Sequence, residues 1–165
     1  MRVRMRRGAL LAALAVALWA AWAAAARVIE GRVIAVNDGD TIVLRSQGRT
    51  VRVRLAEVDA PELHQPYGYQ ARELTARLVL DRNVRVEVVT TDRYDRLVGH
   101  VRTEDGKDLS EELLRSGLAW WYRQYSNNRF FQQLEKSARE QRVGLWAEKD
   151  PVPPWLYRRM HPIVR

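Results

Sequence analysis

The clearest pattern along the chain is a set of five short segments in which apolar and β-branched residues recur with a period of about two. Such segments are typical of β-strands with one buried face. The predicted strands cover residues 28–36, 41–45, 50–58, 84–90 and 97–103. Turn-forming residues separate several of them, as in Asn37-Asp38-Gly39-Asp40, Ser46-Gln47-Gly48 and Asp92-Arg93-Tyr94-Asp95.

Three other segments have the features of helices. One has apolar residues three and four positions apart, and the other two begin with capping side chains. The predicted helices are residues 69–80, a segment from a Ser110 N-cap to Gly117, and a segment from Asn127 or Asn128 to about Arg142. Five strands, with one helix inserted after the third, predict an α+β domain: a small closed barrel of the OB-fold type with three helices.

Residues 1–26 differ from the rest of the chain and are expected to be a leader. Four arginines and no acid are followed by an apolar run from Ala9 to Ala26. This is the order of a secretory signal, and the alanines at its end offer cleavage sites. As a helix the run would span about 27 Å, so an uncleaved membrane anchor is the alternative. Both readings predict an extracytoplasmic domain at residues 27–158, followed by a tail at 159–165.

Charge and cysteine content narrow the possible chemistry. Residues 27–165 hold 24 of the 28 basic side chains and all 20 acidic ones, a net charge of +4 that permits an anionic partner. Only three of the basic residues are lysines; arginine suits bidentate phosphate contacts, although genome composition explains the bias equally well. Because the chain has no cysteine, a disulfide, a thiolate metal site and a cysteine nucleophile are excluded.

The segment Arg54-Leu55-Ala56-Glu57-Val58-Asp59-Ala60-Pro61-Glu62 holds most of the candidate chemistry. Pro61 is expected to end a strand, because proline has no N–H for the ladder and fixes φ. Asp59 and Glu62 therefore lie on a rigid turn. Carboxylates beside an arginine suit a hard cation and a phosphate. The alternatives are a solvated arginine face and, for Glu62, a carboxylate at the N-terminus of a helix.

Two further turns carry charged side chains. In Asp38-Gly39-Asp40-Thr41 the Asp-Gly pair is a strong hairpin signal, but Asp40 also offers a carboxylate at the start of a strand. The spacing of its acids excludes an EF-hand. The loop Asp92-Arg93-Tyr94-Asp95-Arg96 is either a charged hairpin tip or a place where an arginine binds a phosphate and a tyrosine stacks on a base.

Together these motifs resemble the staphylococcal-nuclease-like (thermonuclease) family. The matching pieces are Asn37-Asp38-Gly39-Asp40-Thr41, Arg54 to Glu62, Gln65-Pro66-Tyr67-Gly68, Asp92 to Arg96, Gly117-Leu118-Ala119, Gly144-Leu145-Trp146 and Pro153-Pro154-Trp155. The resemblance covers about residues 27–158 in consistent order. It implies a Ca²⁺-dependent hydrolase that cleaves phosphodiester bonds in DNA, RNA or both and leaves 3′-phosphate and 5′-hydroxyl ends.

The resemblance also implies roles for individual residues. The implied metal ligands are Asp40, Asp59 and the carbonyl of Ala60; the implied catalytic residues are Arg54, Glu62 and Arg96; the implied substrate-binding residues are Tyr94 and Tyr125. Glu62 would take a proton from an attacking water, and the two arginines would hold the phosphate.

The chain departs from the family at three places. Residue 60 is alanine where the family often has threonine, but alanine supplies the same carbonyl. Asp95 stands where the family often has glycine, next to Arg96, so it is expected to alter the loop or pair with that arginine. The assignment of Tyr125 rests on residues 120–125, which align ambiguously.

Two other functions are compatible with parts of this pattern. A non-catalytic OB-fold module that binds single-stranded nucleic acid needs a basic groove and aromatic side chains, but no paired acids and no base. A secreted structural or interaction domain needs none of these. The joint presence of Asp40, Asp59, Glu62 and two arginines favours the nuclease. We expect a monomer with a nucleic-acid substrate and no protein partner, and contact with a membrane only if the leader is retained.

Overall fold

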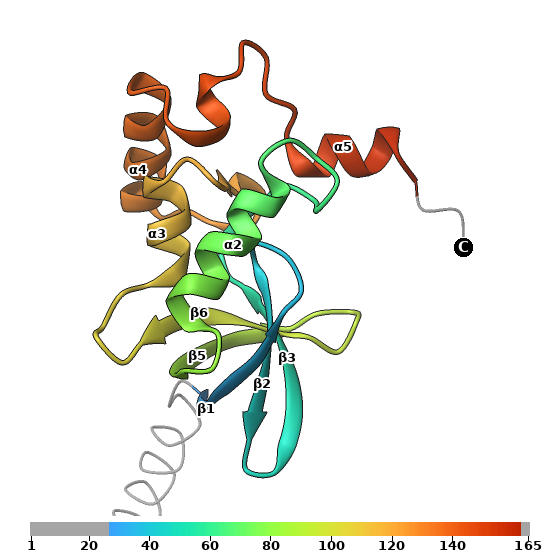
Figure 1. Cartoon of the computed structure of the whole chain (residues 1–165), viewed down its shortest axis with the longest axis vertical. Coiled ribbons are helices and arrows are strands. Elements are labelled where there is room, and N and C mark those ends of the chain that lie inside the picture. The colour runs from blue at the N-terminus through green and yellow to red at the C-terminus, as the bar shows by residue number, and fades with distance from the viewer. Residues whose placement is uncertain (1–26, 163–165) are drawn as a thin grey trace, which may run out of the picture.

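The domain is a closed five-stranded barrel carrying helices on one side (Figure 1). A computed structural model describes residues 27–162, so the expected leader lies outside the described residues. The barrel strands are β1 (Arg27–Val36), β2 (Thr41–Ser46), β3 (Arg49–Leu55), β5 (Asn83–Thr91) and β6 (Leu97–Thr103). They pair in the order β1-β2-β3-β6-β5, and β5 closes the barrel onto β1. The prediction of an α+β OB-fold barrel is confirmed.

The β2–β3 hairpin illustrates how the sequence produces the barrel. Its inward side chains are buried and apolar: Ile42, Leu44, Val53 and Leu55. Arg52 and Arg54 alternate with them and point out of the barrel. The predicted turn is present, with Gln47 at φ 48° and Gly48 at φ 76°. Two successive positive φ values give the turn whose twist matches that of a hairpin.

The described residues contain four α-helices, one more than predicted. They are α2 (Gly68–Val79), α3 (Leu109–Arg115), α4 (Arg129–Glu140) and α5 (Pro154–Met160), with 3-10 turns at η1 (Arg123–Tyr125) and η2 (Gly144–Ala147). The extra helix, α5, begins at a proline, which suits the first helical position because its missing N–H would be unpaired there. It continues past residue 158, where the domain was expected to end.

The third strand ends earlier than predicted, at Leu55 instead of Val58. Glu57 has a φ of 64°, a left-handed conformation that no strand continues through. The chain turns there and forms β4 (Val58–Asp59), which pairs outside the barrel with β7 (Trp120–Trp121). The turn at Glu57, and not Pro61, therefore separates Asp59 from the barrel strand.

The predicted cap of the second helix is also wrong by two residues. Asp108, not Ser110, is the N-cap of α3: its Oδ1 accepts the N–H groups of Ser110 at 2.9 Å and Glu111 at 3.2 Å. The Ser110 hydroxyl instead donates to the carbonyl of Ala56 at 3.1 Å and ties α3 to the end of β3. Asn128, by contrast, caps α4 as predicted.

The hydrophobic core fills the barrel and the space beneath the helices. Its largest fully buried side chains are Ile42, Leu44, Leu55, Leu109, Leu113 and Leu114. Between residues 27 and 162, no helix combines the length and the apolar character needed to cross a membrane.

Candidate active site

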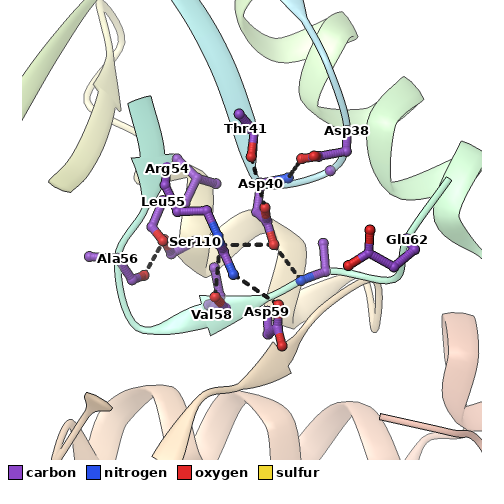
Figure 2. A network of polar contacts seen from close by, with 12 residues as sticks. Asp38, Asp40, Thr41, Arg54, Leu55, Ala56, Val58, Asp59, Glu62 and Ser110 are labelled. Atoms are coloured by element: carbon purple, nitrogen blue, oxygen red, sulfur yellow. Dashed lines mark hydrogen bonds and ion pairs between the residues drawn. The ribbon is translucent and has the colours of Figure 1, made fainter. Parts of the chain in front are cut away.

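The acidic candidates meet where the β1–β2 turn, the end of β3 and the short strand β4 come together. Figure 2 shows Arg54 lying between Asp40 and Asp59, with Glu62 farther along the chain. Residues 41 and 54 are paired across the β2–β3 ladder, and the N–H of Leu55 donates to the carbonyl of Asp40 at 2.8 Å. The barrel register therefore fixes Asp40 beside the end of β3.

The turn that carries Asp40 is held from several sides. Asp38 accepts the N–H of Asp40 at 3.0 Å, and the Thr75 hydroxyl on α2 donates to the carbonyl of Gly39 at 2.6 Å. A Cβ at Gly39 would lie 2.7 Å from the Cβ atoms of both Ala60 and Ala71, so only glycine fits there. This close packing brings the Asp40 turn against the segment that carries Asp59 and Ala60.

Arg54 is the centre of the cluster. Its Nη1 lies 2.9 Å from Asp40 Oδ2, and its Nη2 donates to Asp59 Oδ1 at 2.8 Å. Nη1 also donates to the carbonyls of Leu55 and Val58, at 3.2 and 3.0 Å. The guanidinium thus bridges two carboxylates and closes the turn after β3. These contacts are all with the protein itself, and the phosphate contact implied for Arg54 stays a prediction.

The two aspartates are almost completely buried, with 5% of Asp40 and 1% of Asp59 exposed. Burial raises the pKa of Asp40 to about 7, although Arg54 and the Ala60 N–H, 2.6 Å from Asp40 Oδ2, oppose the shift. Burial also raises the pKa of Asp59, against the hydrogen bond from Arg158. Two desolvated carboxylates this close favour a bound cation, because a positive charge offsets their desolvation.

The structure adds a residue that no motif in the sequence indicates, Arg158 on α5. Its Nη1 donates to Glu62 Oε1 at 2.7 Å and to Asp59 Oδ1 at 3.2 Å, and its Nη2 donates to Asp59 Oδ2 at 2.9 Å. Although partial burial lowers it, these hydrogen bonds raise the pKa of Arg158 above its usual value. The only sequence signal was Pro154, which starts the helix that places Arg158 one turn later.

The oxygen donors of the cluster suit a hard cation. When all three are ionised, the carboxylates of Asp40, Asp59 and Glu62 face the guanidinium groups of Arg54 and Arg158, which leaves one negative charge. The guanidinium of Arg158 already lies against Asp59 and Glu62, which shows that a positively charged group fits beside these carboxylates. Within the described residues, no group of three or more His, Cys, Asp or Glu side chains is arranged to hold a metal ion. The pair Asp40 and Asp59, with the Ala60 carbonyl, could hold one if water or substrate completes the coordination.

Arg96 and Tyr94 lie on the β5–β6 loop and make their own set of contacts. Arg96 is paired with Asp92 and not with Asp40 or Asp59: both its Nε and its Nη2 lie 2.8 Å from Asp92 Oδ2. Although desolvation opposes it, hydrogen bonds from Arg96 and Tyr94 lower the pKa of Asp92. Tyr94 is exposed, with the Arg96 guanidinium 5.5 Å from its ring centre.

Asp95 was expected to alter this loop or to pair with Arg96, and the structure shows its conformation and the partner of Arg96. Asp95 has a φ of 57°, the left-handed conformation that glycine adopts without strain. The ion-pair partner of Arg96 is Asp92, four residues earlier, instead of Asp95. Aspartate is among the few other residues that tolerate this conformation, so the loop keeps a turn that a glycine would also make.

Of the tyrosines after Gly117, Tyr122 is tied to the acid-bearing segment, because its backbone N–H donates to the carbonyl of Glu57 at 2.8 Å. Burial raises the pKa of Tyr122, and the charge of Asp59 adds to the shift. The ring of Tyr122 stacks on Trp155 of α5, with centroids 5.5 Å apart and planes 2° apart. Tyr125 is exposed and packs edge-on against Tyr122 at 4.8 Å. Its substrate contact stays a prediction.

Comparison with known proteins agrees with this architecture. Residues 52–148 match the family described as staphylococcal nuclease homologue. An "Uncharacterized endonuclease" of Escherichia coli is 40% identical over 137 residues, which cover 83% of this chain and 90% of that protein. A "Micrococcal nuclease" of Shigella flexneri is 37% identical over 139 residues, 78% of this chain and 80% of that protein. The chain therefore belongs to the staphylococcal nuclease family, and its assignment as a nuclease, a hydrolase of nucleic acids, is confirmed.

Proposed function

We propose that this protein is an exported, calcium-dependent nuclease that hydrolyses DNA, RNA or both to 3′-phosphate and 5′-hydroxyl products. The observation that supports the proposal most directly is the buried pair Asp40 and Asp59, bridged by Arg54. A module that only binds nucleic acid gains nothing from burying two carboxylates, which repel phosphate and are costly to desolvate.

The residues that would hold Ca²⁺ are Asp40, Asp59 and the carbonyl of Ala60. When bound, the ion would neutralise part of the phosphate charge and polarise the P–O bond. The Ala60 N–H already donates to Asp40. This contact keeps the main chain of residue 60 beside the aspartate, which suits a site that uses its carbonyl.

Glu62 is the proposed general base. Its side chain is 41% exposed, in contrast to the two aspartates, so water can reach it. The backbone N–H of Glu62 donates to Gln65 Oε1 at 3.2 Å, and Gln65 in turn donates to the carbonyl of Val152. A held backbone with an accessible carboxylate is the arrangement that proton transfer from a water requires.

Arg54 and Arg96 are the proposed phosphate-binding residues. Arg54 bonds to the aspartates and Arg96 to Asp92, so a phosphate would have to share or replace these carboxylate contacts. Tyr94, next to Arg96, offers an exposed ring on which a base can stack.

A digestion assay tests the proposal and separates it from the alternatives. Purified protein is incubated with fluorescently labelled DNA or RNA, with Ca²⁺ and then with a chelator. Cleavage that the chelator abolishes, with products carrying 3′-phosphate ends, is the expected result. Binding without cleavage would favour the single-stranded nucleic-acid-binding module, and neither binding nor cleavage would favour a structural domain.

Export is a separate part of the proposal and has its own test. The support is the sequence of residues 1–26, with its basic start and its apolar run. N-terminal sequencing of the protein recovered outside the cytoplasm should begin near Arg27 if the leader is cleaved. A start at Met1 in a membrane fraction would indicate an anchor, and protein found only in the cytoplasm would contradict export.

A further inference from the structure

The C-terminal helix α5 reaches into the acidic site with one side chain. Figure 1 shows α5 beside the loop that leads into α2, so the end of the described chain returns to the segment that follows Asp59. The Arg158 guanidinium contacts both oxygens of Asp59 and one oxygen of Glu62. These are the residues that the proposed function assigns to metal binding and to proton transfer.

The contact with Asp59 puts Arg158 in competition with a cation for the same carboxylate. Asp59 Oδ1 accepts hydrogen bonds from Arg54 and Arg158, and Oδ2 accepts one from Arg158. A divalent ion needs direct contact with a carboxylate oxygen. On the side of Asp59 that Arg158 covers, the ion and the guanidinium would occupy the same space, so an ion that binds Asp59 from this side must displace Arg158.

The helix is anchored in a way that permits this displacement. Pro154 is the only buried residue of α5, and the Arg158 side chain is still 43% exposed. The other anchors of the helix are Trp155, which stacks on Tyr122 and packs edge-on against Trp120, and a hydrogen bond of 3.2 Å from the Tyr157 hydroxyl to the carbonyl of His64. Few buried contacts mean a low cost of local opening.

We propose that Arg158 is a built-in competitor of the divalent cation: α5 covers the acidic site of the metal-free protein and is released when the ion takes Asp59. This inference rests on the proposed calcium site. It explains why an arginine on a lightly held helix reaches a carboxylate that is almost completely buried. Without calcium, Arg158 would neutralise Asp59 and Glu62. The affinity for calcium would be lower than in a protein that lacks this arginine.

The test is a calorimetric titration of the full chain with Ca²⁺ alone, without nucleic acid. Arg158→Ala should bind Ca²⁺ roughly tenfold more tightly than the parent, because charge-assisted hydrogen bonds that oppose the ion are lost. The matched control is Arg159→Ala, which removes the same charge from the neighbouring, exposed position on the same helix. Its affinity should equal that of the parent.

A second measurement needs no variant. Adding Ca²⁺ to the parent should increase hydrogen exchange of the α5 amides while exchange in β4 falls. Unchanged α5 exchange, or an Arg158→Ala affinity no higher than that of the parent, would overturn the inference and leave the proposed function standing. Absence of Ca²⁺ binding by both the parent and Arg158→Ala would overturn the calcium site itself, and the inference with it.

A different observation, on the surface of β3, supports a second inference. Arg52 and Arg54 are two residues apart on the outer face of the strand, about 7 Å along it. Arg52 Nη2 donates to the carbonyl of Tyr94 at 2.6 Å, which places it against the β5–β6 loop. Beyond Arg52 the surface is hollowed into a groove of about 1110 Å³. Its charged lining residues are Arg27, Glu30, Arg49, Arg52, Arg85 and Asp95.

This groove carries more positive than negative charge. Four arginines face two acids, and Glu30 is engaged by Arg85 at 4.0 Å. Because an extended nucleic-acid strand carries one phosphate per nucleotide, arginines spaced along a strand suit consecutive phosphates. We infer that the groove binds the strand that continues from the scissile phosphate, with Arg52 on the neighbouring phosphate. This inference rests on the proposed placement of the substrate at Arg54.

Binding measured in a chelator tests this without catalysis. For the double variant Arg49→Ala/Arg52→Ala, affinity for a single-stranded DNA of about 12 nucleotides should fall roughly tenfold, and the salt dependence should weaken by roughly 1 to 2 in slope. The control is Arg77→Ala, an exposed arginine on α2. Its affinity should equal that of the parent. Unchanged binding by the double variant, or a loss no larger than that of Arg77→Ala, would overturn the groove.

Discussion

Two clusters of acidic side chains flank the turn after β3, and they differ in the groups that contact the acids. In the first, Asp40 and Asp59 face the guanidinium groups of Arg54 and Arg158. In the second, Glu57 accepts hydrogen bonds from the Ser126 hydroxyl at 2.8 Å and the Asn128 amide at 3.3 Å. A metal ion can take the place of a guanidinium beside a carboxylate, because both are positively charged. The hydroxyl and amide that contact Glu57 are neutral and leave no such place, so the Glu57 cluster holds parts of the fold together.

The two clusters also differ in the elements of the fold that they join. The Glu57 cluster links the turn after β3 to the N-terminus of α4, because Asn128 caps α4 and Ser126 also accepts from the Trp121 indole at 2.7 Å. His100 lies 3.7 Å from Glu57 and adds to this link. The acidic pair instead joins the barrel to α5, whose contacts are few. An acid that accepts several contacts inside the fold is thus no sign of catalysis in itself, because the kind of partner decides its role.

The sharpest test of this comparison is Glu62→Gln. We expect turnover to fall by roughly 10² or more, because the amide cannot accept the proton of the attacking water. Ca²⁺ binding and the melting temperature should stay close to those of the parent. Glu148→Gln, at an exposed position, is the control. Turnover near that of the parent would remove Glu62 from the chemistry.

Removing a ligand should have the next largest effect. Asp40→Ala should weaken Ca²⁺ binding by at least roughly tenfold, because one of two carboxylates is lost and Arg54 gains freedom to move onto Asp59. The measurement is calorimetric titration with Ca²⁺. If the affinity is unchanged, Asp40 does not belong to the metal site, and the acidic pair would be structural like Glu57.

Glu57→Ala should lower stability and leave turnover unchanged, the opposite of what is expected for Glu62→Gln. Loss of the carboxylate leaves the Ser126 and Asn128 donors without their partner, at a cost of about 1–3 kcal/mol in unfolding free energy. Turnover per folded molecule should remain close to that of the parent. Urea unfolding and an activity assay on the same samples check both parts. A large loss of turnover without loss of stability would contradict the structural role of Glu57 and place it in the chemistry with the acidic pair.

Arg96→Lys tests the ion pair of Arg96 with Asp92, which is more exposed than the pairs of Arg54 with Asp40 and Asp59. Lysine keeps the charge but not the planar fork, so we expect kcat/KM to fall roughly tenfold with the fold unchanged. Activity equal to that of the parent would mean that Arg96 acts only as a distant charge.

The smallest expected effect concerns the partner of Arg96. Because hydrogen bonds lower the pKa of Asp92 in the folded protein, its contribution to stability is present above the ordinary aspartate pKa and is lost as pH falls through the lower, folded value. Asp92→Asn should therefore reduce stability at neutral pH by less than about 1 kcal/mol, since the pair is partly in solvent. The difference should vanish in acid. Urea unfolding at several pH values measures it, and a difference independent of pH would contradict this assignment.

Local patterns determined much of the architecture. The period of two in the strands, the Gln47-Gly48 turn and the cap at Asn128 act over a few residues, so the sequence alone predicts them. The motifs around Asp40 and Asp59 likewise identified the nuclease family. Where local signals competed, the prediction failed: Ser110 and Asp108 are both capping residues, and only the packing of Ser110 against Ala56 decides between them.

Tertiary structure alone decided how the charges are used. The left-handed turn at Glu57 places Asp59 outside the barrel, and contacts between residues far apart in the chain bring Arg158 to Asp59 while Arg96 stays with Asp92. The positions of carboxylates and guanidinium groups can be read from the sequence. Their pairing depends on the distances and desolvation that the complete fold creates, and for that reason no local pattern encodes it.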